Sequence, residues 1–123
     1  MKRARGKGAI YTLQVAIYTN LNSNVAKAEE LEQFRKAAEK AVVELRREGD
    51  EAFYYHGARS STVTVGVFGV KDYEPTKPGK ESMALIELRR KYPLNMVNGA
   101  KYLVKSRGQK EAREQASFLV PIP

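Results

Sequence analysis

The residues best suited to contact a ligand are aromatic, hydroxyl and amide side chains that recur at every second position of short apolar segments. Phe53 and Tyr55 alternate in one such segment, and Gln14 and Tyr18 fall in an earlier one. Aromatic rings stack on the apolar faces of sugars and on the π-faces of bases, and hydroxyls and amides add directional hydrogen bonds. The pattern therefore predicts non-covalent binding by seven candidate residues: Gln14, Tyr18, Phe53, Tyr55, Thr62, Thr64 and Phe68.

The sequence carries little that could perform catalysis. It has no cysteine and a single histidine, His56, which lies beside a predicted turn. It contains no Gly-rich phosphate loop before a helix, no His-Glu-x-x-His pair, no Gly-x-Ser-x-Gly elbow and no acidic calcium loop. We therefore expect a protein that is not an enzyme and that has no catalytic residue, metal or cofactor.

Two segments with apolar residues at alternate positions predict the central strands of a sheet. They cover about residues 9–19 and residues 61–69. The aromatic segment at residues 51–56 precedes the second of these, and residues 56–60 form a turn between them. We expect these last two strands to pair as an antiparallel hairpin.

Two helices are predicted between and after these strands. Residues 25–48 carry an apolar stripe at helical spacing, and Gly49 is suited to end that helix. A loop over residues 71–80 leads to a second helix over residues 81–92, which Pro93 ends. In the remaining chain we expect a short strand at residues 102–104, a polar loop at residues 106–115 and an edge strand at residues 116–122.

This order of elements predicts an α+β fold of the split β-α-β (ferredoxin-like) type. Its mixed, largely antiparallel sheet carries two helices on one face and an extra C-terminal strand. We expect the helices to cover the face with Tyr11, Leu13, Val15, Val63, Val65 and Val67, and all seven candidate residues to lie on the opposite face. A register shift of one residue would exchange the two faces.

Positive charge is concentrated at the N-terminus. Of the 22 basic residues, Lys2, Arg3, Arg5 and Lys7 lie within residues 1–8, and removing them leaves 18 against 14 acidic residues. We predict a basic flexible tail over residues 1–8 and a single domain over residues 9–123. Such a tail favours polyanions, namely nucleic acid, anionic lipid or an anionic wall polymer, or is merely solvated. No apolar run suits a membrane span or a signal peptide within this chain.

Four stretches of the chain resemble the SPOR (sporulation-related repeat) domain. They are Tyr11-Thr-Leu-Gln-Val-Ala, the helix end Val43-Glu-Leu-Arg-Arg-Glu-Gly, Glu51-Ala-Phe-Tyr-Tyr, and Thr62-Val-Thr-Val-Gly-Val-Phe. The resemblance covers about residues 11–68 and extends loosely to Val104. The chain is also similar to SPOR-like C-terminal domains of uncharacterised planctomycete envelope proteins. It implies the split β-α-β fold, location in the cell envelope or periplasm, and non-enzymatic binding of peptidoglycan glycan strands. The residues that match the family motif are Gln14, Thr62, Thr64, Gly66 and Phe68.

The chain departs from the family pattern after Val15, where Ala16, Ile17 and Tyr18 follow, and the segment beyond Val104 has no counterpart. Two alternatives to glycan binding therefore stay open. The same sheet face could stack the bases of RNA or another single-stranded nucleic acid, with phosphates held by the tail and by Arg89, Arg90, Lys91, Lys101, Lys105 and Arg107. In a structural or assembly role, that face would instead be covered by the C-terminal segment or by a second copy in a homo-oligomer.

Overall fold

A five-stranded mixed sheet with two helices forms the body of the chain. The computed structural model describes residues 10–20, 27–69, 71–73, 81–99, 103–104 and 113–122. The helices are α2 (Ala28–Arg47) and α3 (Met83–Lys91). The sheet contains β1 (Tyr11–Thr19), β2 (Ala52–His56), β3 (Ser60–Phe68), β4 (Met96–Val97) and β7 (Phe118–Pro121).

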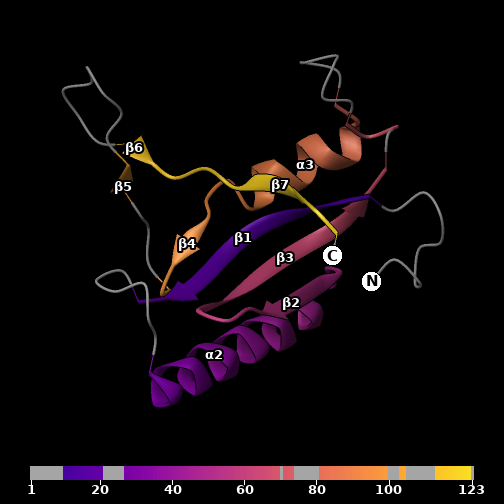
Figure 1. Ribbon diagram of the computed structural model, residues 1–123. Helices are drawn as coiled ribbons and strands as arrows, with labels where there is room; N and C mark the ends of the chain where they lie inside the picture. Colours follow the sequence, from indigo (N-terminus) through magenta and orange to yellow (C-terminus); the bar gives the residue numbers. More distant parts are fainter. Residues whose placement is uncertain are drawn as a thin grey trace.

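The strands follow the order β2-β3-β1-β4, and the long strand β1 has two partners along its other edge (Figure 1). Its first half, Tyr11 to Gln14, pairs antiparallel with β7. Farther along, Ala16 and Ile17 pair in parallel with β4. This confirms the predicted α+β fold with a split β-α-β arrangement and an extra C-terminal strand.

Hydrogen bonds and backbone conformation mark the start of both helices and the end of α2. The backbone N–H of Lys27 donates to Glu30 Oε1 at 3.2 Å at the start of α2. Gly49, with φ of +97°, follows its end. At the start of α3, Leu85 N–H donates to Ser82 Oγ at 3.2 Å. One buried cluster then joins the two helices to the same face of the sheet: Ala38, Val42 and Leu85 with Leu13, Val63 and Val65.

Two compensating β-bulges interrupt the ladder between β1 and β3. Gln14 lies opposite Thr64 and Ala16 opposite Val63, so Val15 is an extra residue on β1. Toward the other end, Gly66 and Val67 of β3 together oppose the single residue Thr12. Gly66 has φ of +72°, and the Thr12 hydroxyl donates to its carbonyl at 2.7 Å. Each bulge shifts the inward and outward alternation by one position.

These bulges overturn two of the predicted side-chain directions. Phe68 follows the bulge at Gly66 and is buried in the core, 5% exposed, instead of lying on the opposite face. Tyr18 follows the bulge at Val15 and packs against the core beside Ala41 and Glu44 of α2. Strict alternation by two therefore failed for both candidate binding residues that lie beyond a bulge.

The C-terminal part also differs from the sequence-based expectation. The strand expected at residues 102–104 is β5 (Leu103–Val104), and it pairs with β6 (Arg113–Glu114) in a separate two-stranded sheet. Residues 113–114, expected in a loop, are therefore strand. The edge strand expected at residues 116–122 is confirmed as β7, whereas β4 was not anticipated. The predicted tail, residues 1–8, lies outside the described residues.

Candidate functional site

The face of the sheet opposite the helices is formed by two rows of directly opposed residues. The first row crosses four strands as Phe53, Thr64, Gln14 and Phe118. The second row crosses them as Tyr55, Thr62, Ile17 and Val97. Opposed residues on neighbouring strands share a face, so these eight side chains form one surface, here called the outer face.

Access to the outer face is greatest where its aromatic rings lie. Phe118 is 39% exposed, and Phe53, Tyr55 and Thr62 are half-buried. Thr64 and Gln14, between the rings in the first row, are only 1% and 9% exposed. The accessible part of the surface therefore consists of the three rings with Ile17 and Thr62, and Thr62 is its accessible hydroxyl.

The amide of Gln14 is engaged by the protein itself. Its Nε2 lies 3.4 Å from Asn95 Oδ1, and Asn95 Nδ2 donates to Gln115 Oε1 at 2.9 Å. Asn95 is 2% exposed, and its backbone N–H also donates to the Gln115 carbonyl. This chain of amides fills the point where the partner of β1 changes from β7 to β4. Gln14 therefore has a structural role that the sequence did not indicate.

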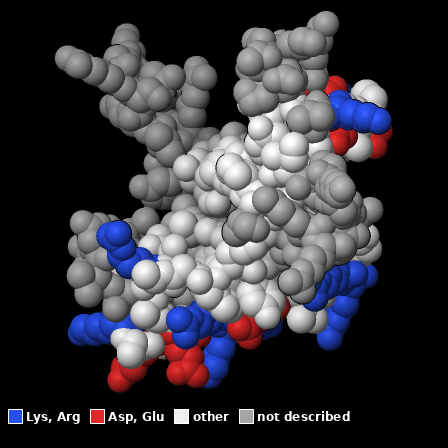
Figure 2. Space-filling model, turned by 45° about the vertical axis from the view of Figure 1, so that its right-hand side comes forward, with Lys and Arg blue, Asp and Glu red and all other residues white. Residues whose placement is uncertain are grey.

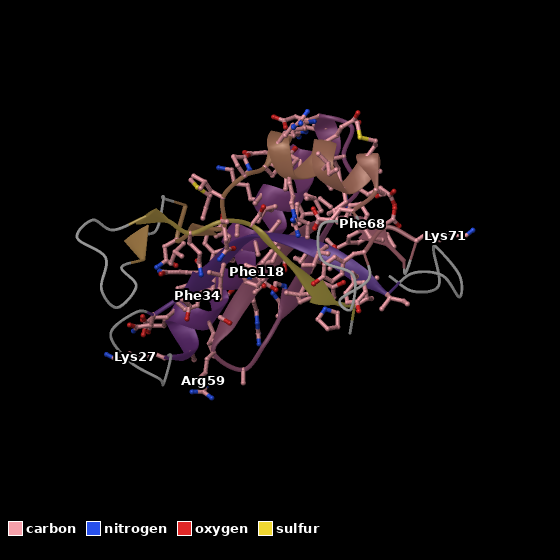
Figure 3. All side chains as sticks on the ribbon, turned by 90° about the horizontal axis from the view of Figure 1, so that it is seen from above. Lys27, Phe34, Arg59, Phe68, Lys71 and Phe118 are labelled. Atoms are coloured by element: carbon pink, nitrogen blue, oxygen red, sulfur yellow. The ribbon has the colours of Figure 1, made fainter. Side chains whose placement is uncertain are left out.

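The structure brings together five of the seven predicted binding residues: Gln14, Phe53, Tyr55, Thr62 and Thr64. Tyr18 and Phe68 lie on the helix side instead. The outer face gains Phe118, which sequence analysis missed. The edge strand predicted at residues 116–122 contained that ring, but its register against β1 was not readable from the sequence. Figure 3 shows that Phe68 and Phe118 lie apart, with Phe68 beside α3 and Phe118 on β7.

The outer face carries no charged residue among its eight members. Burial raises the pKa of the Tyr55 phenol, so this side chain is neutral at physiological pH. Arg46 Nε donates to the Ala52 carbonyl at 3.0 Å at the edge of the sheet, where Arg46 lines a hollow together with Phe53 and Tyr55. In the view of Figure 2, Lys, Arg, Asp and Glu lie mainly at the level of α2, and the middle is formed largely by other residues. The eight residues of the outer face therefore bring no charge of their own to a ligand.

His56 lies on the helix side in a contact with a hydroxyl and a carboxylate. Its Nδ1 is 2.8 Å from Ser61 Oγ and its Nε2 is 2.9 Å from Glu39 Oε2, while its ring lies against Tyr54. Serine, histidine and an acid are the residue types of a nucleophilic triad. Ser61 is only 1% exposed, however, so its Oγ is closed to a substrate carbonyl. The contact instead ties α2 to the β2–β3 hairpin.

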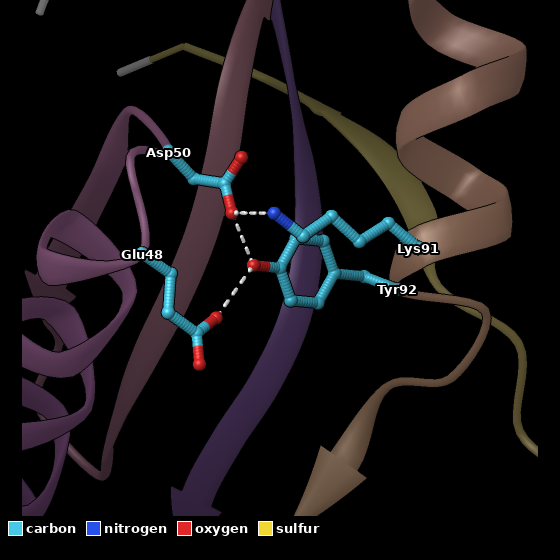
Figure 4. A network of polar contacts seen from close by, with 4 residues as sticks. All are labelled: Glu48, Asp50, Lys91 and Tyr92. Carbon is cyan, nitrogen blue, oxygen red and sulfur yellow. Dashed lines mark hydrogen bonds and ion pairs between the residues drawn. The ribbon is translucent and has the colours of Figure 1, made fainter.

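A second polar network joins the C-terminal ends of the two helices (Figure 4). Lys91 Nζ lies 2.7 Å from Asp50 Oδ2, and the Tyr92 hydroxyl donates to the same carboxylate and lies 3.4 Å from Glu48 Oε2. Burial and the two carboxylates raise the pKa of Tyr92. Burial also acts to raise the pKa of Asp50, but the hydrogen bonds from Lys91 and Tyr92 outweigh it and lower that pKa.

Among the residues that the structure describes, no group of three or more His, Cys, Asp or Glu side chains is placed to hold a metal ion. Neither described helix is long and apolar enough to cross a membrane. In comparisons with known proteins, no family model, no curated protein and no solved structure matches the chain. The resemblance to the SPOR domain therefore stays a prediction from the sequence.

Proposed function

We propose that the chain is a non-enzymatic binding module whose outer face binds glycan strands of peptidoglycan or another polymer of the cell envelope. The observation that carries this proposal is the placement of accessible rings at both ends of one cross-strand row. Phe53 occupies one end of the row and Phe118 the other, with Tyr55 beside Phe53. Rings in this arrangement offer flat apolar surfaces to sugar faces.

The span of the row favours a polymer over a single sugar. Phe53 and Phe118 are separated by three strand-to-strand steps, which correspond to roughly 14 Å. This length exceeds one sugar ring, so a chain of sugars could contact both rings at once. Contacts at two ends of a single chain bind more tightly than either contact alone.

The absence of charge on the outer face favours a glycan over a nucleic acid. Single-strand nucleic-acid grooves combine stacking rings with basic side chains that follow the phosphates. Of the basic residues in the last turn of α3, Arg89 pairs with Glu81 at 2.7 Å and Lys91 pairs with Asp50. These two cations are therefore already neutralised within the protein.

Retention on purified peptidoglycan sacculi tests the proposal. We expect the chain to sediment with sacculi at moderate salt, and we expect Tyr55→Ala and Phe118→Ala each to reduce affinity several-fold or more, because each loses apolar contact area that contributes about 25 cal/mol per Å². Tyr54→Ala is the matched control, since Tyr54 is 42% exposed on the same strand but belongs to the helix-facing row. Retention unchanged in all three variants would refute the proposal.

Nucleic-acid binding is the second candidate because of the net charge of +8. A salt titration with a single-stranded oligonucleotide distinguishes it, since phosphate contacts make affinity fall steeply with salt. A structural role that uses the outer face as a protein interface predicts instead a stable dimer in sedimentation velocity. In that case Phe118→Ala would convert the dimer to monomer without any added polymer.

A further inference from the structure

On the helix side of the sheet, a cavity lies between the C-terminal half of α2 and the chain that leaves the end of α3. Its volume is about 400 Å³, and its walls come from β1, the second half of α2 and the segment that follows α3. Most of the lining is apolar: Val15, Ala41, Leu45, Val63, Leu94 and Met96. The volume falls within the range of small-molecule sites.

A few polar groups meet the same cavity, and their charges are unbalanced. Glu44 in the last turn of α2 and Glu48, the residue that caps its C-terminal end, are four positions apart, and both line the cavity. Lys91 lines the cavity as well, but its ammonium group forms an ion pair with Asp50 at 2.7 Å. Among the described residues, neither Glu44 nor Glu48 forms an ion pair. Two like charges at this spacing on a helix repel each other, so a cation between them would be favourable.

Two phenol groups complete the polar side of the cavity. The Tyr92 ring is held in place by its hydrogen bond to Asp50. Burial and the nearby charge of Glu44 raise the pKa of Tyr18, so its hydroxyl stays protonated. The Tyr92 ring already has Lys91 Nζ 5.5 Å from its centroid, so the neutral Tyr18 ring beside Glu44 is the aromatic surface left for a ligand cation.

From this geometry we propose that the cavity is a binding site for a small amphipathic cation. Its apolar body would lie between α2 and Met96, and its ammonium group would face Glu44 and Glu48. The site is distinct from the outer face, because the sheet separates the two. The occupant argued for is therefore an amine with an aromatic or alkyl body, independent of any polymer on the other side.

A matched pair of probes tests the charge preference. Tryptamine and indole-3-propionate share an indole ring but carry opposite charges at neutral pH. In protein labelled at the methionine methyl groups, we expect tryptamine to shift the NMR signal of Met96, which lines the cavity, and to leave Met83 unchanged. Met83 is 64% exposed and is the internal control. Indole-3-propionate should bind about tenfold more weakly or not at all.

Substitutions in the cavity complete the test. Glu44→Gln with Glu48→Gln should weaken tryptamine binding about three- to tenfold. Glu29→Gln with Glu32→Gln removes the same charge from the exposed start of the same helix and should change it less than about twofold. Ala41→Phe should fill the cavity and abolish the Met96 shift, and a denaturation curve checks that this variant is folded. Equal binding of both probes, an unmoved Met96 signal, or equal losses in both double variants would overturn the proposal.

Discussion

At the scale of the single residue, Val15 and Gly66 decide which aromatic rings reach the outer face. Each marks a bulge, and each bulge turns the following residues by one position. As a result Tyr18 and Phe68 pack on the helix side, while Phe53 and Tyr55, on the unbulged strand β2, stay where alternation places them. The composition of the candidate surface thus follows from two backbone irregularities.

The conformation of Gly66 leads to a specific prediction. Its φ is +72°, and a Cβ atom built there would lie 2.7 Å from Leu88 Cδ2 and 2.8 Å from the Phe68 ring. We expect Gly66→Ala to lower the free energy of unfolding by about 2–4 kcal/mol, because backbone strain and a core clash add together. Urea denaturation followed by circular dichroism measures this difference.

Gly49→Ala is the matched control for that substitution. Gly49 also has a positive φ, +97°, but no atom lies within 4 Å of the added Cβ. Only the conformational penalty, about 1 kcal/mol, applies there. If the two substitutions destabilised the protein equally, the clash of the added Cβ with Leu88 and Phe68 would be unimportant, and the positive φ alone would explain the cost.

The sequence allowed only part of this to be anticipated. Alternation correctly placed Leu13, Val63 and Val65 in the core, because the pattern between the bulges is regular. A glycine inside a strand is a known sign of a bulge, and Gly66 carried that signal. Val15 gave no such sign of a bulge, because β-branched residues are common in strands. The direction of Tyr18 was therefore not readable from the sequence.

At the scale of the elements, the long periodic segments were predictable and the two-residue strands were not. Helix α2 and strands β1 and β3 each repeat their pattern over several periods, which makes the pattern specific. β4 has two residues, too few to show alternation, and its position depends on the buried amide of Asn95 beside Gln14. Such a short strand is set by tertiary contacts, which a local pattern does not record.

The polar network of Glu48, Asp50, Lys91 and Tyr92 at the ends of the two helices predicts that stability depends on pH. The pKa of Asp50 is lowered, so its contribution to stability is present above its unfolded pKa and is lost as pH falls through the folded value. The pKa of Tyr92 is raised, so its contribution is present below its unfolded pKa and is lost as pH rises through the folded value. This polar network should therefore stabilise the fold most between about pH 4 and pH 10.

Denaturation curves of two variants measure this window. The stability difference between wild type and Asp50→Asn should be greatest near neutral pH and should narrow below about pH 4. The difference between wild type and Tyr92→Phe should narrow above about pH 10. Glu32→Gln, which breaks an exposed ion pair with Lys36, should show only a small difference at every pH. If the stability differences between wild type and the Asp50 and Tyr92 variants did not change with pH, the predicted pH dependence would be wrong.

At the scale of the whole molecule, half of the net charge comes from a sequence segment that is distinct from the eight residues of the outer face. The outer face has no charged member, whereas Lys2, Arg3, Arg5 and Lys7 account for half of the net charge of +8. A long-range attraction from the basic segment and a short-range contact through the rings would then respond differently to salt. The first is screened over about 8 Å at physiological ionic strength, and the second is hardly affected.

A variant that lacks residues 2–8 separates these two contributions. If the outer face recognises glycan strands, the variant should lose most of its binding to any polyanion at low salt but keep its retention on sacculi at moderate salt, within about twofold. A second variant, with the four basic residues changed to glutamine, distinguishes loss of charge from loss of length. Retention that disappears in both variants at moderate salt, while Phe118→Ala still binds, would show that the basic segment rather than the ring-bearing face holds the polymer.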